Sequence, residues 1–137
     1  MAYAIIEISH IEVDRRNIFQ ATMEGMRRTV AALDPAPTIA LIDGNKVPPG
    51  LVCPGRAIVK GDQLEACISA ASILAKTILD ALMLEHAKSY PDYGFEIHKG
   101  FLTPAHLAVL KTLGACAIHR HSYASVRKPL LMQAELF

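Results

Sequence analysis

Two short apolar segments, each followed by an aspartate beside a glycine, lie between long helical segments of this chain. Thr38–Ile42 is followed by Asp43-Gly44, and Ala57–Lys60 is followed by Gly61-Asp62. Short apolar runs bounded by turn residues are typical of strands buried on both faces. Strands that alternate with helices pack as layers, so the sequence predicts an α/β fold with helices flanking a sheet.

The remaining segments predict three helices and one further strand. Glu12–Leu33 carries apolar side chains every three or four residues, and Asp34-Pro35 ends it because proline cannot continue a helix. Leu64–Lys88 is small and apolar in its first half, which lets a helix lie close on a sheet. Thr103–Leu113 begins with a capping threonine and a proline. Isoleucines alternate between two faces in Tyr3–Ser9, which predicts a strand.

Composition limits the class of protein. The 137 residues are 52% hydrophobic and 20% charged, which suits one core and excludes a disordered chain. No uninterrupted apolar run is long enough to span a membrane, and Glu7 follows the first apolar run too soon for a signal peptide. The three cysteines have no C-x-x-C spacing, as is typical of reduced thiols. We therefore expect one cytoplasmic domain with no membrane association.

Charge is distributed unevenly along the chain. Residues 1–96 carry 9 of the 14 basic and 12 of the 13 acidic residues, a net charge of −3, which leaves +4 for residues 97–137. The second stretch also holds four of the six histidines. This distribution suits a protein that holds cations in one place and a polyanion in another, although chance clustering on a solvated face explains it equally.

Asp43 and Asp62 occupy equivalent places, each just after a predicted strand. Ligand sites in α/β proteins gather at the carboxyl ends of strands. Two carboxylates brought together there need a cation, and hard oxygen ligands suit Mg²⁺ or Mn²⁺. The alternative is that each aspartate only forms a turn beside its glycine.

Other chemical motifs are weak or absent. The glycines of a phosphate-binding G-x-x-x-x-G-K-[ST] loop are missing, and so is a G-x-S-x-G nucleophile motif. His119 and His121, at alternate positions without further ligands nearby, are a weak indication of zinc.

Six ordered motifs together resemble bacterial ribonuclease HII, over residues 3 to about 127. They are LIDGN (41–45), IVKGD (58–62), ISAASILAK (68–76), YPDYGF (90–95), HKGF (98–101) and HRHSY (119–123), and residues 17–23 resemble the family's helix after its third strand. The resemblance implies a ribonuclease H-like mixed sheet flanked by helices, with a C-terminal helical part.

The resemblance also implies a function and its residues. The family cleaves the RNA strand of RNA–DNA hybrids, and cuts at ribonucleotides embedded in duplex DNA, during DNA replication and repair. It uses two divalent metals, Mg²⁺ or Mn²⁺, held by four carboxylates. By their motifs, Asp43 and Asp62 match the last two catalytic and metal-binding carboxylates. The positions that match substrate-binding residues are Tyr93, Lys60, Lys99 and Arg120.

The chain departs from the family at its beginning. The family's first strand carries D-E-x-G-R-G, and no such segment occurs here. We therefore expect a single truncated domain over residues 1–137 that lacks the first two strands. In it, residues 1–96 form the sheet and helices, and residues 97–137 form a basic C-terminal helical region. Without half of the carboxylates, its activity alone is expected to be weak or absent.

Two alternatives remain open at this point. One is a non-catalytic module that binds nucleic acid through its basic residues. The other is a fragment that another polypeptide completes. In either case a strand without its neighbour exposes unpaired backbone groups, which predicts self-association or capture of a complementing segment at the sheet edge.

Overall fold

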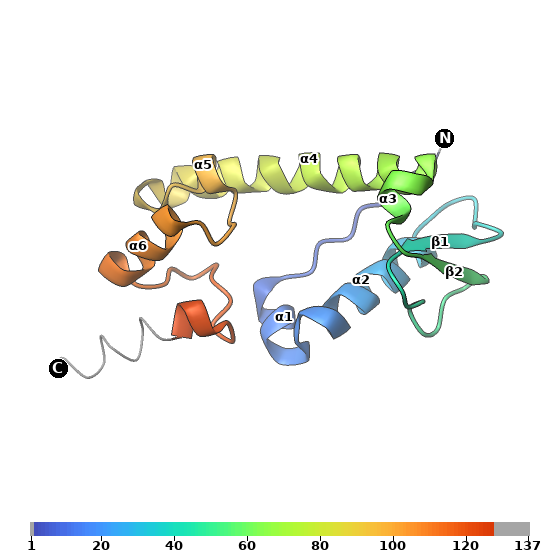
Figure 1. Cartoon of the computed structure of the whole chain (residues 1–137), viewed down its shortest axis with the longest axis horizontal. Helices are drawn as coiled ribbons and strands as arrows, with labels where there is room; N and C mark the ends of the chain where they lie inside the picture. Colours follow the sequence, from blue (N-terminus) through green and yellow to red (C-terminus); the bar gives the residue numbers. More distant parts are fainter. Residues whose placement is uncertain (1, 128–137) are drawn as a thin grey trace. The chain divides into compact units, whose positions relative to one another are not determined.

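The structure, a computed structural model, describes residues 2–127 and contains two compact units that divide between Ala75 and Lys76 (Figure 1). The elements are α1 (His10–Arg16), α2 (Ile18–Ala31), β1 (Ala40–Asp43), β2 (Gly55–Ile58), α3 (Gly61–Leu64), α4 (Ala66–Ser89), the 3₁₀ helix η1 (Pro91–Tyr93), α5 (Phe95–His98) and α6 (Pro104–Leu113). The mixed α/β class predicted from the sequence is confirmed. Residues 128–137 of the predicted C-terminal helical region lie outside the described residues, and the single-domain organisation stays a prediction.

The sheet of the first unit consists of β1 and β2, which run parallel with Asp43 opposite Ile58. The amides of Ala40 and Gly44 donate to the carbonyls of Pro54 and Ile58 over 2.9 Å. Because amides alternate in direction along a strand, those of Leu41 and Asp43 point to the other edge of β1. Within residues 2–127, no further strand pairs with that edge.

The core of the first unit lies between α2 and β1. Val30 of α2 packs with Ala40 and Ile42 of β1, and the half-buried side chains around them are Met26, Leu51 and Cys53. Alternate residues of β1 are therefore buried, whereas Ile39, just before the strand, is 50% exposed. The expectation that both faces of this strand are buried is met on one face only.

The predicted N-terminal strand is not formed in the described part of the chain. Tyr3–Ser9 is extended, and its even-numbered residues are half-buried while its odd-numbered residues are exposed. The alternation predicted for the isoleucines is thus present, with Ile8 only 3.1 Å from the position that a Cβ would take on Gly25. A strand assignment needs a hydrogen-bonded neighbour, and none lies beside this segment within residues 2–127.

The single helix predicted over residues 12–33 is two helices, α1 and α2, separated by Asn17. Asn17 has φ 68° and ψ 161°, which no helical residue adopts, and its side chain accepts a hydrogen bond from the amide of Gln20. Arg28 of α2 pairs with Glu12 of α1 at 2.7 Å and with Glu24 at 2.7 Å, which ties the two helices together. Hydrogen bonds from Arg27 and Arg28 lower the pKa of Glu24 to about 2.

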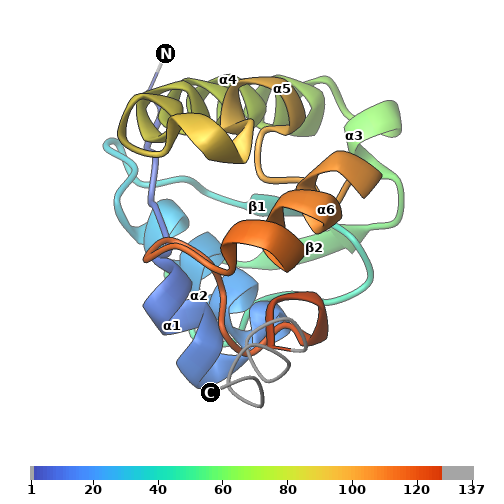
Figure 2. The ribbon, with the colours of Figure 1, turned by 90° about the vertical axis from the view of Figure 1, so that its left-hand side faces the viewer.

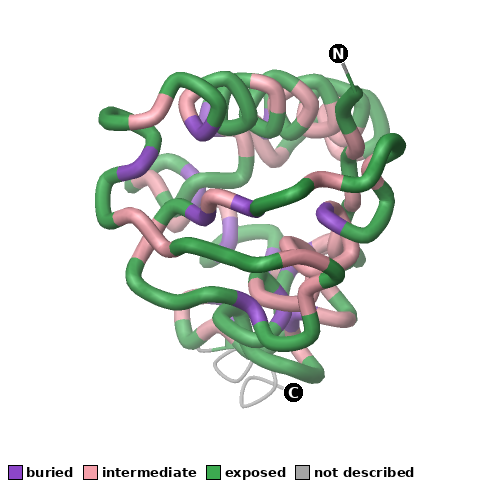
Figure 3. The backbone as a smooth tube through the Cα atoms, turned by 90° about the vertical axis from the view of Figure 1, so that its right-hand side faces the viewer, coloured by how far each residue is buried: buried purple, intermediate pink, exposed green. Residues whose placement is uncertain are grey.

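The long helix α4 is mostly exposed along its length (Figure 3). Ile68 is its only buried residue, whereas apolar side chains such as Leu79 and Leu84 are exposed. By length and composition alone, with a mean hydropathy of 1.7, α4 is apolar enough to cross a membrane, a test that core helices also pass. The helix therefore presents apolar surface that the described residues do not cover.

The second unit packs α5 and α6 around a small core beside the second half of α4 (Figure 2). Phe95 and Leu110 are its largest fully buried side chains. Thr103 caps α6, as predicted, by accepting a hydrogen bond from the amide of His106. The segment predicted as a loop over residues 90–95 contains η1, followed by the start of α5.

Candidate functional site

Asp43 is the last residue of β1, and its carboxylate is held by the next strand–helix connection. Its Oδ1 accepts a hydrogen bond from the amide of Gly61 over 2.8 Å. Because β1 and β2 are parallel, both strands end at the same edge of the sheet, and this brings the two segments together.

Asp62 lies in the first turn of α3, directly after the glycine that Asp43 binds. Gly61 is buried, and a Cβ at this position would lie 2.6 Å from Cδ1 of Ile68 and 3.4 Å from Oδ1 of Asp43. Lys60 precedes it in the left-handed region at φ 58°. The structure thus brings together three of the predicted residues, Asp43, Asp62 and Lys60, in the first unit.

The carboxylates of this site can accept a hard cation. Asp43 and Asp62 are both exposed, and the hydrogen bond from Gly61 uses only one oxygen of Asp43. Within residues 2–127, no group of three or more histidine, cysteine, aspartate or glutamate side chains is placed to hold a metal. The donor set therefore fits one cation with water in its remaining positions, and lacks the ligands for a second.

Tyr93, the predicted substrate-contacting tyrosine, is held on several sides in the second unit. Its ring stacks on Phe95, with centroids 5.6 Å apart, and its hydroxyl donates to the carbonyl of Gly114 over 3.2 Å. Burial raises its pKa, with smaller contributions from Cys116, Tyr90 and Asp92. Tyr93 also lines a hollow of about 660 Å³, together with Ile97, His98, Thr103 and Val109 among others.

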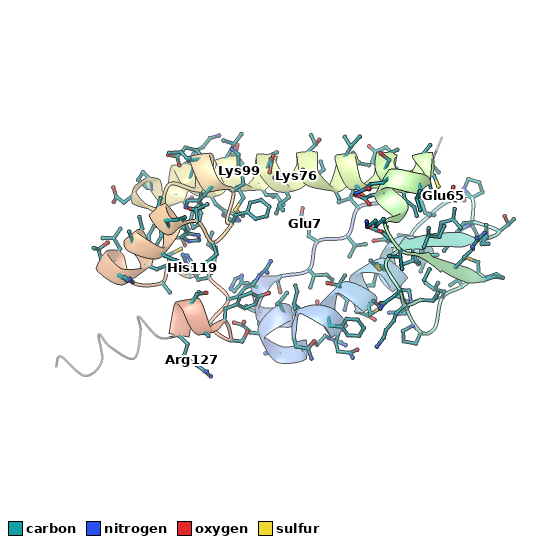
Figure 4. All side chains as sticks on the ribbon, viewed as in Figure 1. Glu7, Glu65, Lys76, Lys99, His119 and Arg127 are labelled. Atoms are coloured by element: carbon teal, nitrogen blue, oxygen red, sulfur yellow. The ribbon has the colours of Figure 1, made fainter. Side chains whose placement is uncertain are left out.

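The two predicted basic residues of the second unit have local contacts. Lys99, labelled in Figure 4, follows α5 in the left-handed region, and its Nζ donates to the carbonyl of Glu96. Arg120 is exposed, donates to the hydroxyl of Tyr123 and lies over its ring. Neither contact neutralises the charge, so both cations remain able to meet a phosphate.

A buried histidine cluster was not predicted from the sequence. His98, His106 and His119 are 7%, 4% and 6% exposed, although His121, two residues further on, is exposed. The rings of His98 and His106 stack with centroids 4.0 Å apart, and Nε2 of His106 lies 3.1 Å from Nε2 of His119. The only available signal was that the four histidines are concentrated in residues 97–137, which does not say which of them are buried.

Comparisons with known proteins agree with the motifs. The family model described as Ribonuclease HII matches residues 1–126. Ribonuclease HII of Maricaulis maris is 60% identical over 119 residues, which cover 87% of this chain and 55% of the relative. That of Xanthomonas campestris pv. campestris is 50% identical over 130 residues, 95% of this chain and 54% of the relative. The chain thus spans about half the length of these curated relatives.

A solved structure shares the fold. The ribonuclease H2 of Pyrococcus horikoshii OT3 aligns with a TM-score of 0.79 at 21% identity, over 93% of this chain and 67% of that chain. The likeness supports the ribonuclease H-like arrangement that the motifs predict. On the family match and the identity to its relatives, this chain belongs to the ribonuclease HII family.

Proposed function

We propose that this chain provides the metal-binding and substrate-contacting part of an endonuclease that cleaves the RNA strand of RNA–DNA hybrids, and duplex DNA at embedded ribonucleotides. The observation that carries the proposal is the hydrogen bond from Gly61 to Asp43, which holds Asp43 next to Asp62 where β1 and β2 end. The family match adds the reaction class, because longer relatives, of which the matched residues cover 55% in one case, are named Ribonuclease HII.

Asp43 and Asp62 would hold Mg²⁺ or Mn²⁺. A bound divalent metal lowers the pKa of the attacking water and stabilises the departing 3′ oxygen. The two aspartates provide acceptor oxygens for one such ion, and Asp43 stays oriented by the Gly61 amide. Since hard cations are normally fixed by several carboxylates plus substrate phosphates, this chain alone should bind metal weakly and have weak or no activity.

The basic residues and Tyr93 would hold the substrate. Lys60 stands beside the two aspartates in the first unit, and Lys99 and Arg120 are available in the second. Each can neutralise a backbone phosphate, which makes binding strongly salt-dependent. Tyr93 would contact the sugar next to the scissile ribonucleotide, as its motif implies by resemblance.

A complementing segment would complete the sheet. The unpaired edge of β1 carries the amides of Leu41 and Asp43. An apolar strand with unpaired amides is a template for another strand. We expect this edge to take the family's D-E-x-G-R-G strand from another polypeptide. Without that polypeptide, we expect a strand from a second copy of the chain to pair there instead.

The experiment adds a separate polypeptide that carries the family's first two strands, with the Asp-Glu pair, to the full 137-residue chain. Mg²⁺-dependent cleavage of a duplex with one ribonucleotide should appear in the mixture. Asp43→Asn and Asp62→Asn should each abolish this cleavage, whereas Glu85→Gln, an exposed carboxylate paired with Lys88, should keep it. Cleavage that persists in both aspartate variants would contradict the proposal.

The competing function is a non-catalytic module that binds nucleic acid. It is favoured by the lack of a third metal ligand beside Asp43 and Asp62 within the described residues. It predicts salt-dependent binding to duplexes that does not discriminate for a ribonucleotide, and no cleavage with the added polypeptide. Filter binding on hybrid and ribonucleotide-containing duplexes separates the two functions. The cytoplasmic location and the role in replication and repair stay predictions.

A further inference from the structure

The buried histidines of the second unit have hydrogen-bond partners that fix their protons. Nδ1 of His106 lies 3.0 Å from the carbonyl of Phe101, and a carbonyl can only accept. His106 therefore carries its proton on Nδ1, and its Nε2 is an acceptor. His119 must then donate from Nε2 across the 3.1 Å contact between the two rings.

The same reasoning extends to both ends of the cluster. Nδ1 of His119 is left as an acceptor, and the amide of Cys116 donates to it over 3.0 Å. The thiol sulfur of Cys116 also lies 3.0 Å from this nitrogen, and the Cys116 carbonyl lies 3.3 Å from it. Nε2 of His98 lies 2.7 Å from the carbonyl of Tyr93 and must donate, while its Nδ1 accepts from the amide of Gly100. Every ring nitrogen of the three histidines thus has at least one hydrogen-bond partner, and this pattern places one proton on each ring.

These histidines hold Tyr93 directly. His98 donates to its backbone carbonyl, and the ring of His119 packs against its ring with centroids 5.4 Å apart. The Tyr93 hydroxyl donates to Gly114, the residue that ends α6 two positions before Cys116. The backbone, ring and hydroxyl of Tyr93 are therefore all positioned by the histidine cluster or by residues next to it.

A proton added to the cluster would break a hydrogen bond at each point of entry. On Nε2 of His106 it would face the N–H of His119. On Nδ1 of His119 it would end the hydrogen bond from the Cys116 amide and turn toward the carbonyl of the same residue, 3.3 Å away. Burial lowers the pKa of His119 to about 4 and also lowers that of His106. Both groups therefore resist protonation at neutral pH.

The ionisable surroundings give no compensation for such a charge. The titratable groups that face His119 are His106 of α6, His98 of α5 and His121 of its own loop, which oppose its protonation, and the Cys116 thiol, whose Sγ lies 3.0 Å from Nδ1. Burial raises the pKa of that thiol, so it supplies no negative charge at neutral pH, and only the backbone carbonyl of Cys116 favours the protonated ring. Around Tyr93, the groups are Cys116, Tyr90 and Asp92, and Asp92 is exposed.

We propose that His98, His106 and His119 are positioning residues that hold Tyr93 for the substrate, and that acid releases Tyr93 by protonating this cluster. The substrate contact of Tyr93 rests on the proposed function. The positioning of Tyr93 by the three histidines does not. His119 acts through Tyr93 and does not touch the substrate.

The first test reads the cluster itself, by NMR of the full chain with labelled imidazole nitrogens and tyrosine rings. At pH 7.5 we expect the proton on Nδ1 of His106 and on Nε2 of His98 and His119. As pH falls, the Tyr93 ring signal should shift together with His119. His119→Gln keeps a donor toward His106 and cannot titrate, so the Tyr93 ring signal should no longer change with pH. In His86→Gln the pH-dependent change should remain. A proton on Nδ1 of neutral His119, or an unchanged Tyr93 shift in His119→Gln, would overturn the proposal.

The second test measures affinity for a short RNA–DNA hybrid at pH 7.5. Loss of one buried hydrogen bond changes an equilibrium about three- to tenfold, so His119→Ala should weaken binding by that factor and His119→Gln should restore most of it. In a Tyr93→Ala background, His119→Ala should have no further effect, and additive losses would refute positioning. If no variant or wild type binds hybrid, the proposed function fails, while the NMR result still decides the histidine arrangement.

Discussion

At the scale of single residues, Gly61 connects the two candidate metal ligands, because its amide binds Asp43 and Asp62 follows it in the chain. A methyl group there would meet Cδ1 of Ile68 at 2.6 Å and would lie 3.4 Å from Oδ1 of Asp43, so relief of the first contact has to move the backbone that holds Asp43 or the Ile68 side chain. Overpacking of this kind typically destabilises by about 1–3 kcal/mol. We expect Gly61→Ala to lower the free energy of unfolding in urea by this amount and to weaken Mn²⁺ binding.

The control removes the clashing atom. Ile68→Val deletes Cδ1 and by itself should cost about 0.5–1.5 kcal/mol. In the double variant the two effects should be less than additive, because the added methyl group then occupies the vacated space. Strictly additive free energies would show that Gly61 is not limited by this contact.

His119 sets a pH dependence for the second unit. Its pKa is about 4 in the folded chain and about 6.5 when exposed, so the unfolded state binds the proton first as pH falls. The stability from neutral His119 is fully present above pH 6.5 and is lost between pH 6.5 and pH 4, by up to about 1.4 kcal/mol per pH unit. Urea unfolding followed by tyrosine fluorescence should report this slope, and His119→Gln should reduce it. An equal slope in both proteins would contradict the assignment.

The aspartate pair could be predicted from the sequence, whereas the histidine cluster could not. Asp43 is the last residue of β1 and Asp62 comes shortly after β2, and parallel strands end at one edge. His106 and His119 are 13 positions apart in sequence, and their contact depends on the direction in which the chain turns after α6. No periodicity in the sequence encodes that turn.

Asn17 determines how the first two helices join at the scale of elements. Its φ of 68° and ψ of 161° fall in a region essentially restricted to glycine, and its side chain caps α2. Asn17→Ala should destabilise the chain by about 0.5–2 kcal/mol, because it loses the cap and gains nothing from the backbone strain, which stays. Asn17→Gly relieves the strain as it loses the cap, so it should be much closer to wild type in thermal unfolding. If both variants lose the same stability, the effect comes from the lost cap alone and the backbone conformation of Asn17 is not strained.

The sequence predicts elements well where they are regular and less well where they depend on neighbours. α6 begins at the predicted threonine cap, and β1 and β2 lie within two residues of their predicted positions. The break at Asn17 was missed because apolar side chains continue at helical spacing across it. Tyr3–Ser9 was assigned to a strand from a real alternation, but a ladder also requires a partner that alternation does not supply.

At the scale of the whole molecule, the open edge of β1 is where we expect association. Ile39 is 50% exposed just before this strand, and charged side chains are a common protection of sheet edges. If the chain self-associates there, Ile39→Lys should lower the apparent mass measured by light scattering at high concentration. Val52→Lys, a matched change at a 64% exposed loop position, should leave it unchanged. If both variants lower the apparent mass equally, association depends on exposed hydrophobic surface in general and not on the edge of β1.

The extended segment Tyr3–Ser9 has side chains that are already in place while its amides make no backbone hydrogen bonds to described residues. Deuterium should therefore replace its amide hydrogens rapidly, even though Ile8 is packed close to Gly25. A strand that pairs with this segment would meet backbone amides whose directions are already fixed. Little further ordering of Tyr3–Ser9 would then be needed for pairing. Its association should then be limited by encounter, at about 10⁵–10⁷ M⁻¹s⁻¹, rather than by a slow folding step.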